Sequence, residues 1–257
     1  MRNISSCNPL SLHRASSRLL KGYFMENYTR RRFIAIMGSA LTAASSAALP
    51  AIAQEATTAA QGPRPVKYGM LHNELRCIGC KACVSACRKT NQVPEGVSRL
   101  NIIQTVDMTA SDTNKPVKQF FRQSCQHCDN PPAVSVCPTG ASFKDALTGI
   151  VDVNDKRCVG CRYCIAACPY HVRFINPTTN TADKCNFCRE TNLAAGKKPA
   201  CVEICPTKAL VFGDLNDPES DIAKMIKNNP IYRSKVYLGT GPNLYRIPGK
   251  YGESDHA

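Results

Sequence analysis

The sequence contains no tryptophan, and aromatic residues make up only 7% of its 257 residues. Acidic residues are also scarce, with 19 Asp and Glu against 33 Lys and Arg, for a formal net charge of +14. Proteins that bind nucleic acid usually combine such basic surfaces with aromatic side chains that stack on bases. Because aromatic residues do not alternate with the basic ones here, the charge does not indicate a nucleic-acid partner.

Cysteine, in contrast, is abundant, with 16 residues. A secreted disulfide scaffold would distribute its cysteines more evenly, whereas fifteen of these fall into four tight groups. Group 1 is Cys77, Cys80, Cys83 and Cys87; group 2 is Cys125, Cys128 and Cys137; group 3 is Cys158, Cys161, Cys164 and Cys168; group 4 is Cys185, Cys188, Cys201 and Cys205. With no Trp and only 43% hydrophobic residues, we expect inorganic cofactors to supply much of the cohesion of the fold.

Group 3, from Cys158 to Pro169, reads C-x2-C-x2-C-x3-C-P, the pattern that binds iron–sulfur clusters in bacterial ferredoxins. Three thiolates on a tight loop can converge on three corners of one cubane, and the fourth points toward a second cluster. Zinc is the competing interpretation, because C-x2-C pairs also form zinc sites. Zinc sites use two such pairs and have no need of four cysteines followed by proline, so the spacing favours iron and sulfur.

The four groups form an internal repeat. Groups 1 and 3 match each other, although Arg88 stands where a proline would be usual after Cys87, and groups 2 and 4 share the ending Cys-Pro-Thr. Each group lends its last cysteine to its partner's cluster, so a ferredoxin unit needs two groups. Four clusters require sixteen thiolates, and only fifteen are present in the groups.

The missing ligand is at Ala133, where the pattern of group 2 calls for cysteine. Three outcomes are open: a [3Fe-4S] cluster, a cubane whose fourth iron binds water or a nearby side chain such as Asp129 or His127, or no cluster. The first is favoured because three thiolates suffice for three irons.

The N-terminal segment accounts for part of the positive charge. Residues 29–34, with Arg30 and Arg31, resemble the twin-arginine export signal, and a weakly apolar stretch ends in the cleavage pattern Ala51-Ile52-Ala53. A membrane anchor is the alternative, although the segment is only weakly hydrophobic. We expect a signal peptide at 1–53, with Met25 as a candidate start, a flexible leader at 54–65 and a periplasmic location, with membrane association through a partner subunit.

Removal of residues 1–53 would leave 26 basic and 18 acidic residues, a net charge of +8. Four oxidised clusters with their thiolates carry about −2 each. The remaining positive charge is therefore interpreted as balance for buried cluster charge.

Hydrophobic alternation and turn residues predict several elements. Strands are expected at 66–71, 100–106, 119–122, 150–153 and near 235–238, with a polar connection around 111–115, one helix at 218–227 and an irregular segment at 239–252.

The order of the four groups resembles the four-cluster ferredoxin subunits of membrane-linked respiratory reductases, and in particular the iron–sulfur subunit family of the formate-dependent (cytochrome c) nitrite reductase system. The segments that carry the resemblance are Val97–Leu100, Phe121–Cys128, Cys137–Ser142, Tyr163–Tyr170, Ala182–Cys185 and Leu244–Pro248. The cysteine motifs alone also fit subunits of polysulfide, tetrathionate or dimethyl sulfoxide reductases.

The resemblance implies an α+β fold of two ferredoxin-like βαβ units related by an internal repeat, with irregular insertions and a C-terminal extension. The outer unit would comprise 66–124 and 180–217, the inner unit 125–179 and the extension 218–257. The implied ligand sets are Cys77, Cys80, Cys83 and Cys205; Cys185, Cys188, Cys201 and Cys87; Cys158, Cys161, Cys164 and Cys137; and, beside Ala133, Cys125, Cys128 and Cys168. The expected cofactors are three [4Fe-4S] clusters and one [3Fe-4S] or incompletely ligated [4Fe-4S] cluster.

The implied function is electron transfer without a catalytic site, from a polytopic quinol-oxidising membrane subunit to a periplasmic multihaem cytochrome c or another terminal reductase. A subunit of a molybdenum-dependent sulfur-compound or sulfoxide reductase is the first alternative. An enzyme that uses an open iron at the Ala133 cluster as a Lewis acid is the second. His127 and His171 lie beside cysteine groups, where hydrogen bonding is the expected role.

Overall fold

A computed structural model describes residues 65–107, 117–250 and 252. These residues belong to one of the two units into which the chain divides, Thr58–Ala257. The expected signal peptide, Met25, the leader up to residue 64 and the polar connection at 111–115 lie outside the described residues. Among the described residues, no helix combines the length and apolar composition needed to cross a membrane.

Strand β1, Tyr68–Asn73, is the centre of a three-stranded sheet. It pairs antiparallel with β8, Leu210–Asp214, and parallel with β9, Leu244–Ile247. Met70 and Leu71 of β1 are fully buried, because the strand packs on both faces. The strand predicted at 66–71 is confirmed with a shift of two residues.

The other strands form three antiparallel pairs. The first is the hairpin of β2, Leu100–Asp107, and β3, Val117–Ser124, which confirms the strands predicted on either side of the polar connection. The remaining pairs are β4, Ser142–Lys144, with β5, Val151–Val153, and β6, Phe174–Ile175, with β7, Ala182–Asp183. Strand β5 confirms the prediction at 150–153.

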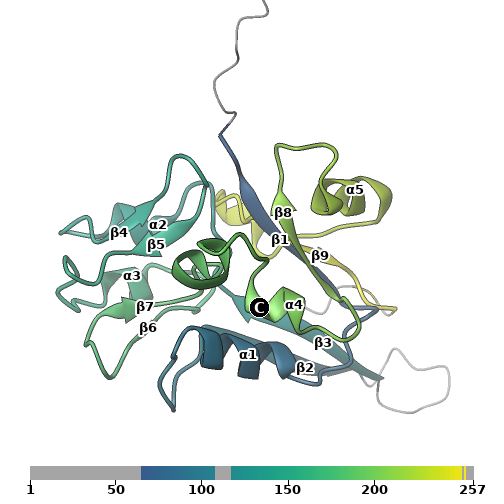
Figure 1. Cartoon of the computed structure of the whole chain (residues 1–257), viewed down its shortest axis with the longest axis horizontal. Helices are drawn as coiled ribbons and strands as arrows, with labels where there is room; N and C mark the ends of the chain where they lie inside the picture. Colours follow the sequence, from purple (N-terminus) through teal and green to yellow (C-terminus); the bar gives the residue numbers. More distant parts are fainter. Residues whose placement is uncertain (1–64, 108–116, 251, 253–257) are drawn as a thin grey trace, which may run out of the picture. The chain divides into compact units, whose positions relative to one another are not determined.

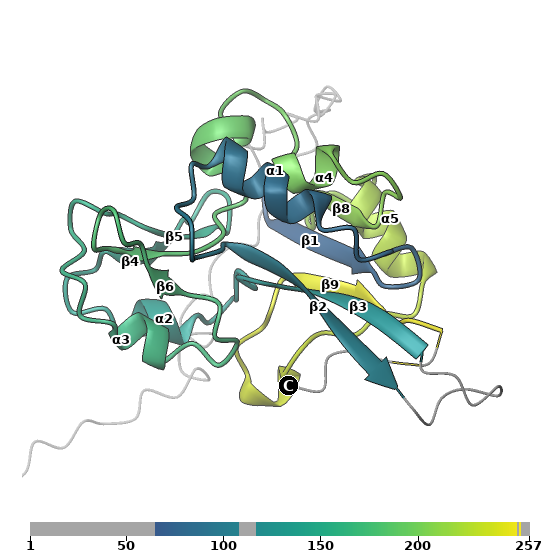
Figure 2. The same cartoon turned by 90° about the horizontal axis from the view of Figure 1, so that it is seen from below.

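Each cysteine group contributes a short helix. These helices are α1, Ala82–Thr90, α2, Pro132–Ser135, α3, Tyr163–Ala166, and α4, Ala200–Glu203. A π-helical segment, η1, covers Arg189–Leu193. Helix α1 packs against α4, and α2 packs against α3 (Figure 1). Figure 2 shows the same grouping, with α2 beside α3 and α1 beside α4. The fold therefore brings group 1 to group 4 and group 2 to group 3.

Helix α5, Asp221–Asn228, packs on β8 and confirms the predicted helix near 218–227. It begins where the hydroxyl of Ser220 accepts a hydrogen bond from the backbone N–H of Ala223, a standard N-cap. Ile222 is fully buried against Leu71 and Ile247, which anchors the helix to the sheet.

Two predictions in the C-terminal part were wrong. Residues 236–238 form a single 3₁₀ turn, η2, Val236–Leu238, instead of a strand, because Lys235 and Gly239 on either side adopt left-handed backbone angles. The segment expected to be irregular contains β9. A four-residue strand between Pro242 and Pro248 gives little sequence signal, and its pairing with β1 stabilises it.

The mixture of helices with small sheets is confirmed. A structural repeat is not established, because the strands of the described residues are not arranged as two equal sets: there is one three-stranded sheet, one long hairpin and two short pairs. The boundaries of the outer and inner units stay predictions.

Candidate iron–sulfur centres

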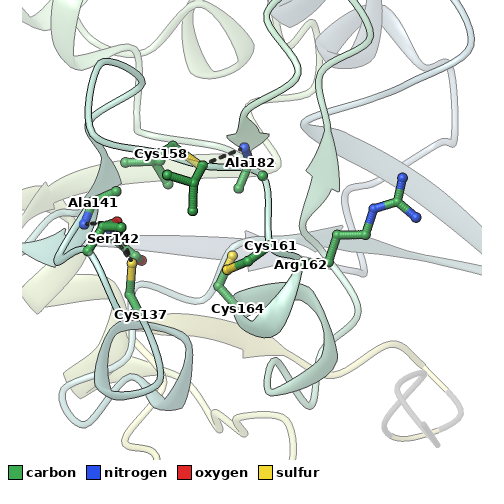
Figure 3. Close-up of a pocket in the computed structure, with 12 residues that line it drawn as sticks. Cys137, Ala141, Ser142, Cys158, Cys161, Arg162, Cys164 and Ala182 are labelled. Carbon is green, nitrogen blue, oxygen red and sulfur yellow. Dashed lines mark hydrogen bonds between the residues drawn. The ribbon is translucent and has the colours of Figure 1, made fainter.

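Four thiols from groups 2 and 3 line one cavity of about 330 Å³ (Figure 3). They are Cys137, after α2, Cys158 and Cys161, on the loop that enters α3, and Cys164, in α3. The backbone N–H of Ser142 donates to Cys137 Sγ at 3.3 Å, and that of Ala182 donates to Cys158 Sγ at 3.4 Å. Such N–H donors stabilise thiolate, the form in which cysteine binds metal.

A second cavity, of about 340 Å³, has the same construction from groups 1 and 4. Its thiols are those of Cys77, Cys80, Cys83 and Cys205, and the N–H of Ala209 donates to Cys205 Sγ at 3.3 Å. Cys80 here and Cys161 in the first cavity are the two exposed cysteines among the described residues. In each cavity, therefore, one of the four cysteines lies at the protein surface.

A third set of thiols, Cys87, Cys185, Cys188 and Cys201, is buried. The amide of Asn91 donates to Cys188 Sγ at 3.4 Å and reaches Cys87 Sγ at 3.8 Å, and so connects groups 1 and 4.

A guanidinium also contacts this buried set. Arg122 donates to Cys201 Sγ at 3.4 Å and to Cys185 Sγ at 3.7 Å. Each of the four sulfurs of the third set therefore has a side-chain donor, from Asn91 or Arg122, at 3.4 to 3.8 Å.

The fourth set contains three thiols. Cys128 and Cys168 pack in one buried cluster with Ala133, whose side chain is 5% exposed, and with Tyr170. Burial, followed by the neighbouring Cys125 thiol, raises the pKa of Cys128 to about 12. The fold thus places Ala133 beside two of the thiols of its expected cluster, those of Cys128 and Cys168.

Most of the buried thiols carry raised pKa values. Burial is the main cause for Cys201, whose pKa rises to about 11, and for Cys87, whose pKa is also raised by the nearby Cys185 and Cys201 thiols. At the less buried Cys137, burial alone would raise the pKa, but the hydrogen bonds from Ser142, Thr139 and Ala141 together outweigh it and the pKa is lowered. Crowded, buried thiols that must lose their protons together fit a site in which metal binding displaces the protons.

The four sets do not resemble a mononuclear site. Among the described residues, no three His, Cys, Asp or Glu side chains are arranged to hold a single metal ion. The thiolates around an iron–sulfur cluster stand farther apart, because each binds a different iron.

Of the two side chains considered as substitutes for the missing thiolate, Asp129 has other partners, whereas Nε2 of His127 is buried and has no hydrogen-bond partner among the described residues. The Asp129 carboxylate accepts hydrogen bonds from the ammonium of Lys67 at 2.9 Å, and from the ammonium of Lys144 and the amide of Asn243 at 3.1 Å. Burial alone would raise the pKa of Asp129, but these donors outweigh it and lower the pKa to about 2. His127 accepts an N–H from Val151 at 3.1 Å, and its ring stacks on Phe187 at 3.7 Å.

Sequence reasoning did not single out two of the buried cations, Arg122 and Lys184. The side chains of Arg122, Arg173 and Lys184 are almost fully buried near the cysteine groups. Lys184 donates to the carbonyl of Cys185 and pairs with Asp152 at 3.7 Å. A charged residue directly after the apolar pair Phe120-Phe121 was the available signal for Arg122, but the pattern was interpreted only as a strand.

Arg88, which replaces the proline usual after Cys87, has a structural role. Its guanidinium donates to the carbonyls of Pro94, at 2.5 Å, and Val97, at 2.8 Å. It therefore fixes the loop that follows α1.

Comparison with known families gives two matches, both to models described as 4Fe-4S dicluster domains, over residues 76–141 and 117–215. The first match covers groups 1 and 2, and the second covers groups 2, 3 and 4. The cysteine sets and these matches define the class: ferredoxin-type iron–sulfur electron-transfer subunits.

Three relatives place the chain within this class. Protein NrfC of Escherichia coli K12 is 58% identical over 226 residues, which are 88% of this chain and 98% of NrfC. The B subunit of polysulfide reductase from Wolinella succinogenes is 50% identical over 72% of this chain and 96% of its own length. The thiosulfate reductase electron transfer subunit PhsB of Salmonella typhi is 53% identical over 70% of this chain and 92% of its own length. The chain belongs to the NrfC family.

Proposed function

We propose that this chain carries electrons from a quinol-oxidising membrane subunit to a periplasmic terminal reductase, and that this reductase is the cytochrome c nitrite reductase, which reduces nitrite to ammonia. The identity to NrfC, over nearly the whole of that protein, is the observation that carries the choice of system. When bound, the clusters accept and release single electrons.

The cysteine sets supply the route. The exposed thiols of Cys80 and Cys161 bring one corner of each of two cavities to the surface, where a partner can approach. The other two sets are buried, and the packing of α1 on α4 and of α2 on α3 holds them in place. The protein contributes positions, N–H donors to sulfur and protection from solvent.

The proposed cofactors are three [4Fe-4S] clusters and a [3Fe-4S] cluster beside Ala133. The ion pairs of Asp129 with Lys67 and Lys144 support the three-iron form, since this carboxylate is not free to bind a fourth iron. Two of the proposed ligand sets each line one cavity, and the other two consist of buried thiols.

Export through the twin-arginine route is part of the proposal. Clusters inserted in the reducing cytoplasm require a folded protein to cross the membrane, because free thiols would pair as disulfides in the periplasm. Residues 29–34 and the Ala51-Ile52-Ala53 pattern support it. N-terminal sequencing of the periplasmic protein would test it, and a chain that starts at Met25 or Met1 in that fraction would contradict cleavage after residue 53.

A second candidate is electron transfer to a molybdenum-dependent sulfur-compound reductase, which the identities to the polysulfide reductase subunit and PhsB support. Those alignments cover 72% and 70% of this chain, against 88% for NrfC, so the nitrite system is preferred. An enzyme with an open iron site is less favoured, because the Asp129 carboxylate is held by Lys67 and Lys144 and is not free to act as an acid or base.

The test is anaerobic stopped-flow mixing of the reduced, cluster-loaded chain with a terminal reductase. We expect rapid reoxidation, followed by visible absorbance, with the multihaem nitrite reductase and nitrite. Polysulfide with its molybdenum reductase should give slow reoxidation. Fast reoxidation only in the second mixture would overturn the proposal in favour of the alternative.

A further inference from the structure

Arg122, on β3, contacts the buried set formed by Cys87, Cys185, Cys188 and Cys201. Its side chain is fully buried. The guanidinium donates to the sulfurs of Cys201 and Cys185, and its Nε donates to the hydroxyl of Ser124 at 2.8 Å. Two of these three hydrogen bonds are thus to expected iron ligands.

The positive charge of Arg122 is not balanced by a carboxylate among residues 65–107, 117–250 and 252. Two other cations near the cysteine groups do have carboxylate partners. Arg99 pairs with Asp183 at 2.9 Å, and Lys184 pairs with Asp152. Burial alone would lower the pKa of Arg122, yet the Cys201 and Cys185 thiols outweigh burial and raise it. An unpaired buried cation is costly, so its counter-charge is expected to be the cluster itself.

We propose that Arg122 sets the reduction potential of the cluster held by Cys87, Cys185, Cys188 and Cys201. This inference rests on the proposed iron–sulfur assignment and goes beyond it, because it names a residue that ligates nothing and controls the order in which the centres are reduced. In this role Arg122 does not bind iron itself and acts through its charge and its hydrogen bonds to two ligand sulfurs.

The direction of the effect follows from charge. Reduction adds one negative charge to a cluster that is already anionic, and a fixed positive charge a few ångströms away favours the reduced form in a medium of low dielectric constant. N–H donors to the sulfurs act in the same direction. The guanidinium therefore raises the potential of this cluster. The cluster of Cys77, Cys80, Cys83 and Cys205, with a corner at the surface, lacks such a donor from Arg122.

The test compares Arg122→Gln, which removes the charge and keeps an N–H donor, with Arg122→Lys, which keeps the charge. Redox titration of the isolated, cluster-loaded chain is followed by EPR, and the relevant signal is the one that Cys201→Ser removes. We expect its midpoint potential to shift to more negative values in Arg122→Gln, and to shift less in Arg122→Lys. An unchanged potential in the Gln variant, or equal shifts in both, would overturn the proposal.

A measurement on the unmodified protein covers the case in which the variants do not retain clusters. With ¹⁵N-arginine labelling, pulsed EPR of the same reduced signal should show a nitrogen coupling, because the guanidinium contacts two ligand sulfurs. Arg99, whose guanidinium contacts Asp183 and Asn186, serves as the matched control: the coupling should persist in Arg99→Lys. Absence of coupling in the unmodified protein would refute the contact. None of these measurements involves a terminal reductase, so they stand or fall separately from the nitrite assignment.

Discussion

The carboxylate of Asp129 lies 2.9 Å from the ammonium of Lys67, a residue that directly precedes the first strand. Lys144 pairs with the other carboxylate oxygen at 3.1 Å. Because two cations hold this side chain, it would have to break both ion pairs to reach iron. A cluster bound beside Ala133 would therefore be completed by another ligand or remain at three irons.

This relationship predicts the behaviour of two variants. Ala133→Cys should supply the missing thiolate, convert the cluster to [4Fe-4S], remove the [3Fe-4S] EPR signal of the oxidised protein and raise the iron content by about one per chain, since a cubane holds one iron more. Asp129→Asn should leave that signal unchanged, since the carboxylate does not bind iron. EPR and iron analysis of the anaerobically purified protein measure both effects.

The control for an added thiol is Ala166→Cys, at an exposed position of α3. It should change neither the signal nor the iron content. A [3Fe-4S] signal that survives in Ala133→Cys, or disappears in Asp129→Asn, would show that the vacant corner does not face Ala133.

The pairing of groups 2 and 3 gives the second prediction. Cys164 and Cys168 both pack in the buried cluster of Cys128 and Ala133, but only Cys164 also lines the cavity of Cys137 and Cys158. Cys168→Ser should therefore remove the [3Fe-4S] signal, while Cys164→Ser should remove a cubane signal and leave the [3Fe-4S] signal. The opposite outcome, or loss of the same signal in both variants, would mean that the thiols are paired differently.

The third prediction concerns the loop that carries Cys158 and Cys161. Gly160 between them has φ +66°, and a Cβ at this position would lie 2.7 Å from the carbonyl oxygen of Asn180. A left-handed conformation costs an L-residue about 1–2 kcal/mol, and the backbone carbonyl cannot move aside as a flexible side chain would. Gly160→Ala should lower the iron content and the unfolding temperature.

Gly196 is the matched control, because it has φ +69° and no atom within 4 Å of the place that an alanine Cβ would take. Gly196→Ala carries the same backbone penalty without the clash. A larger loss of iron and of thermal stability is expected in Gly160→Ala. If both alanine variants lose equal amounts of iron and thermal stability, the effect comes from backbone conformation alone and not from the clash with Asn180.

The cysteine grouping was readable from the sequence because ligand spacing is a local property. The intervals around Cys158 and Cys77 are set by the geometry of one loop around one cluster, so the pattern alone places them. Strands such as β2 and β3 were equally local, since apolar residues on both sides of a polar connection indicate a hairpin.

The failures involved long-range contacts. Strand β9 exists because Leu244–Ile247 adds to β1, which lies near the other end of the described chain, and nothing in its own four residues signals this. The roles of Asp129 and Arg122 depend on partners from distant segments, Lys67 and Cys201. Adjacency in sequence suggested that Asp129 could bind iron, whereas the fold pairs its carboxylate with two lysines.

The last prediction concerns pH. His72 on β1 is fully buried, and its Nδ1 accepts the backbone N–H of Arg122 at 3.3 Å. Burial, together with Arg246 and Arg122, lowers its pKa from 6.5 to about 3. The unfolded chain therefore binds a proton near pH 6.5 that the folded chain does not bind. The free energy of unfolding should fall as the pH decreases below 6.5, and this histidine contributes a loss of about 1 kcal/mol between about pH 7 and 5.5.

His72→Asn retains an acceptor for the Arg122 N–H but cannot be protonated, so it should reduce the pH dependence. For a chain of this size, the unfolding temperature of the variant should fall by about 2–4 °C less than that of the unmodified chain over this range. His127, also buried with a lowered pKa, accounts for a remaining slope. His171→Asn, at an exposed position with φ 50° that asparagine tolerates, is the control and should retain the full slope. If His72→Asn keeps the full slope as well, protonation of His72 does not limit stability, and the cluster ligands or His127 must account for the acid sensitivity.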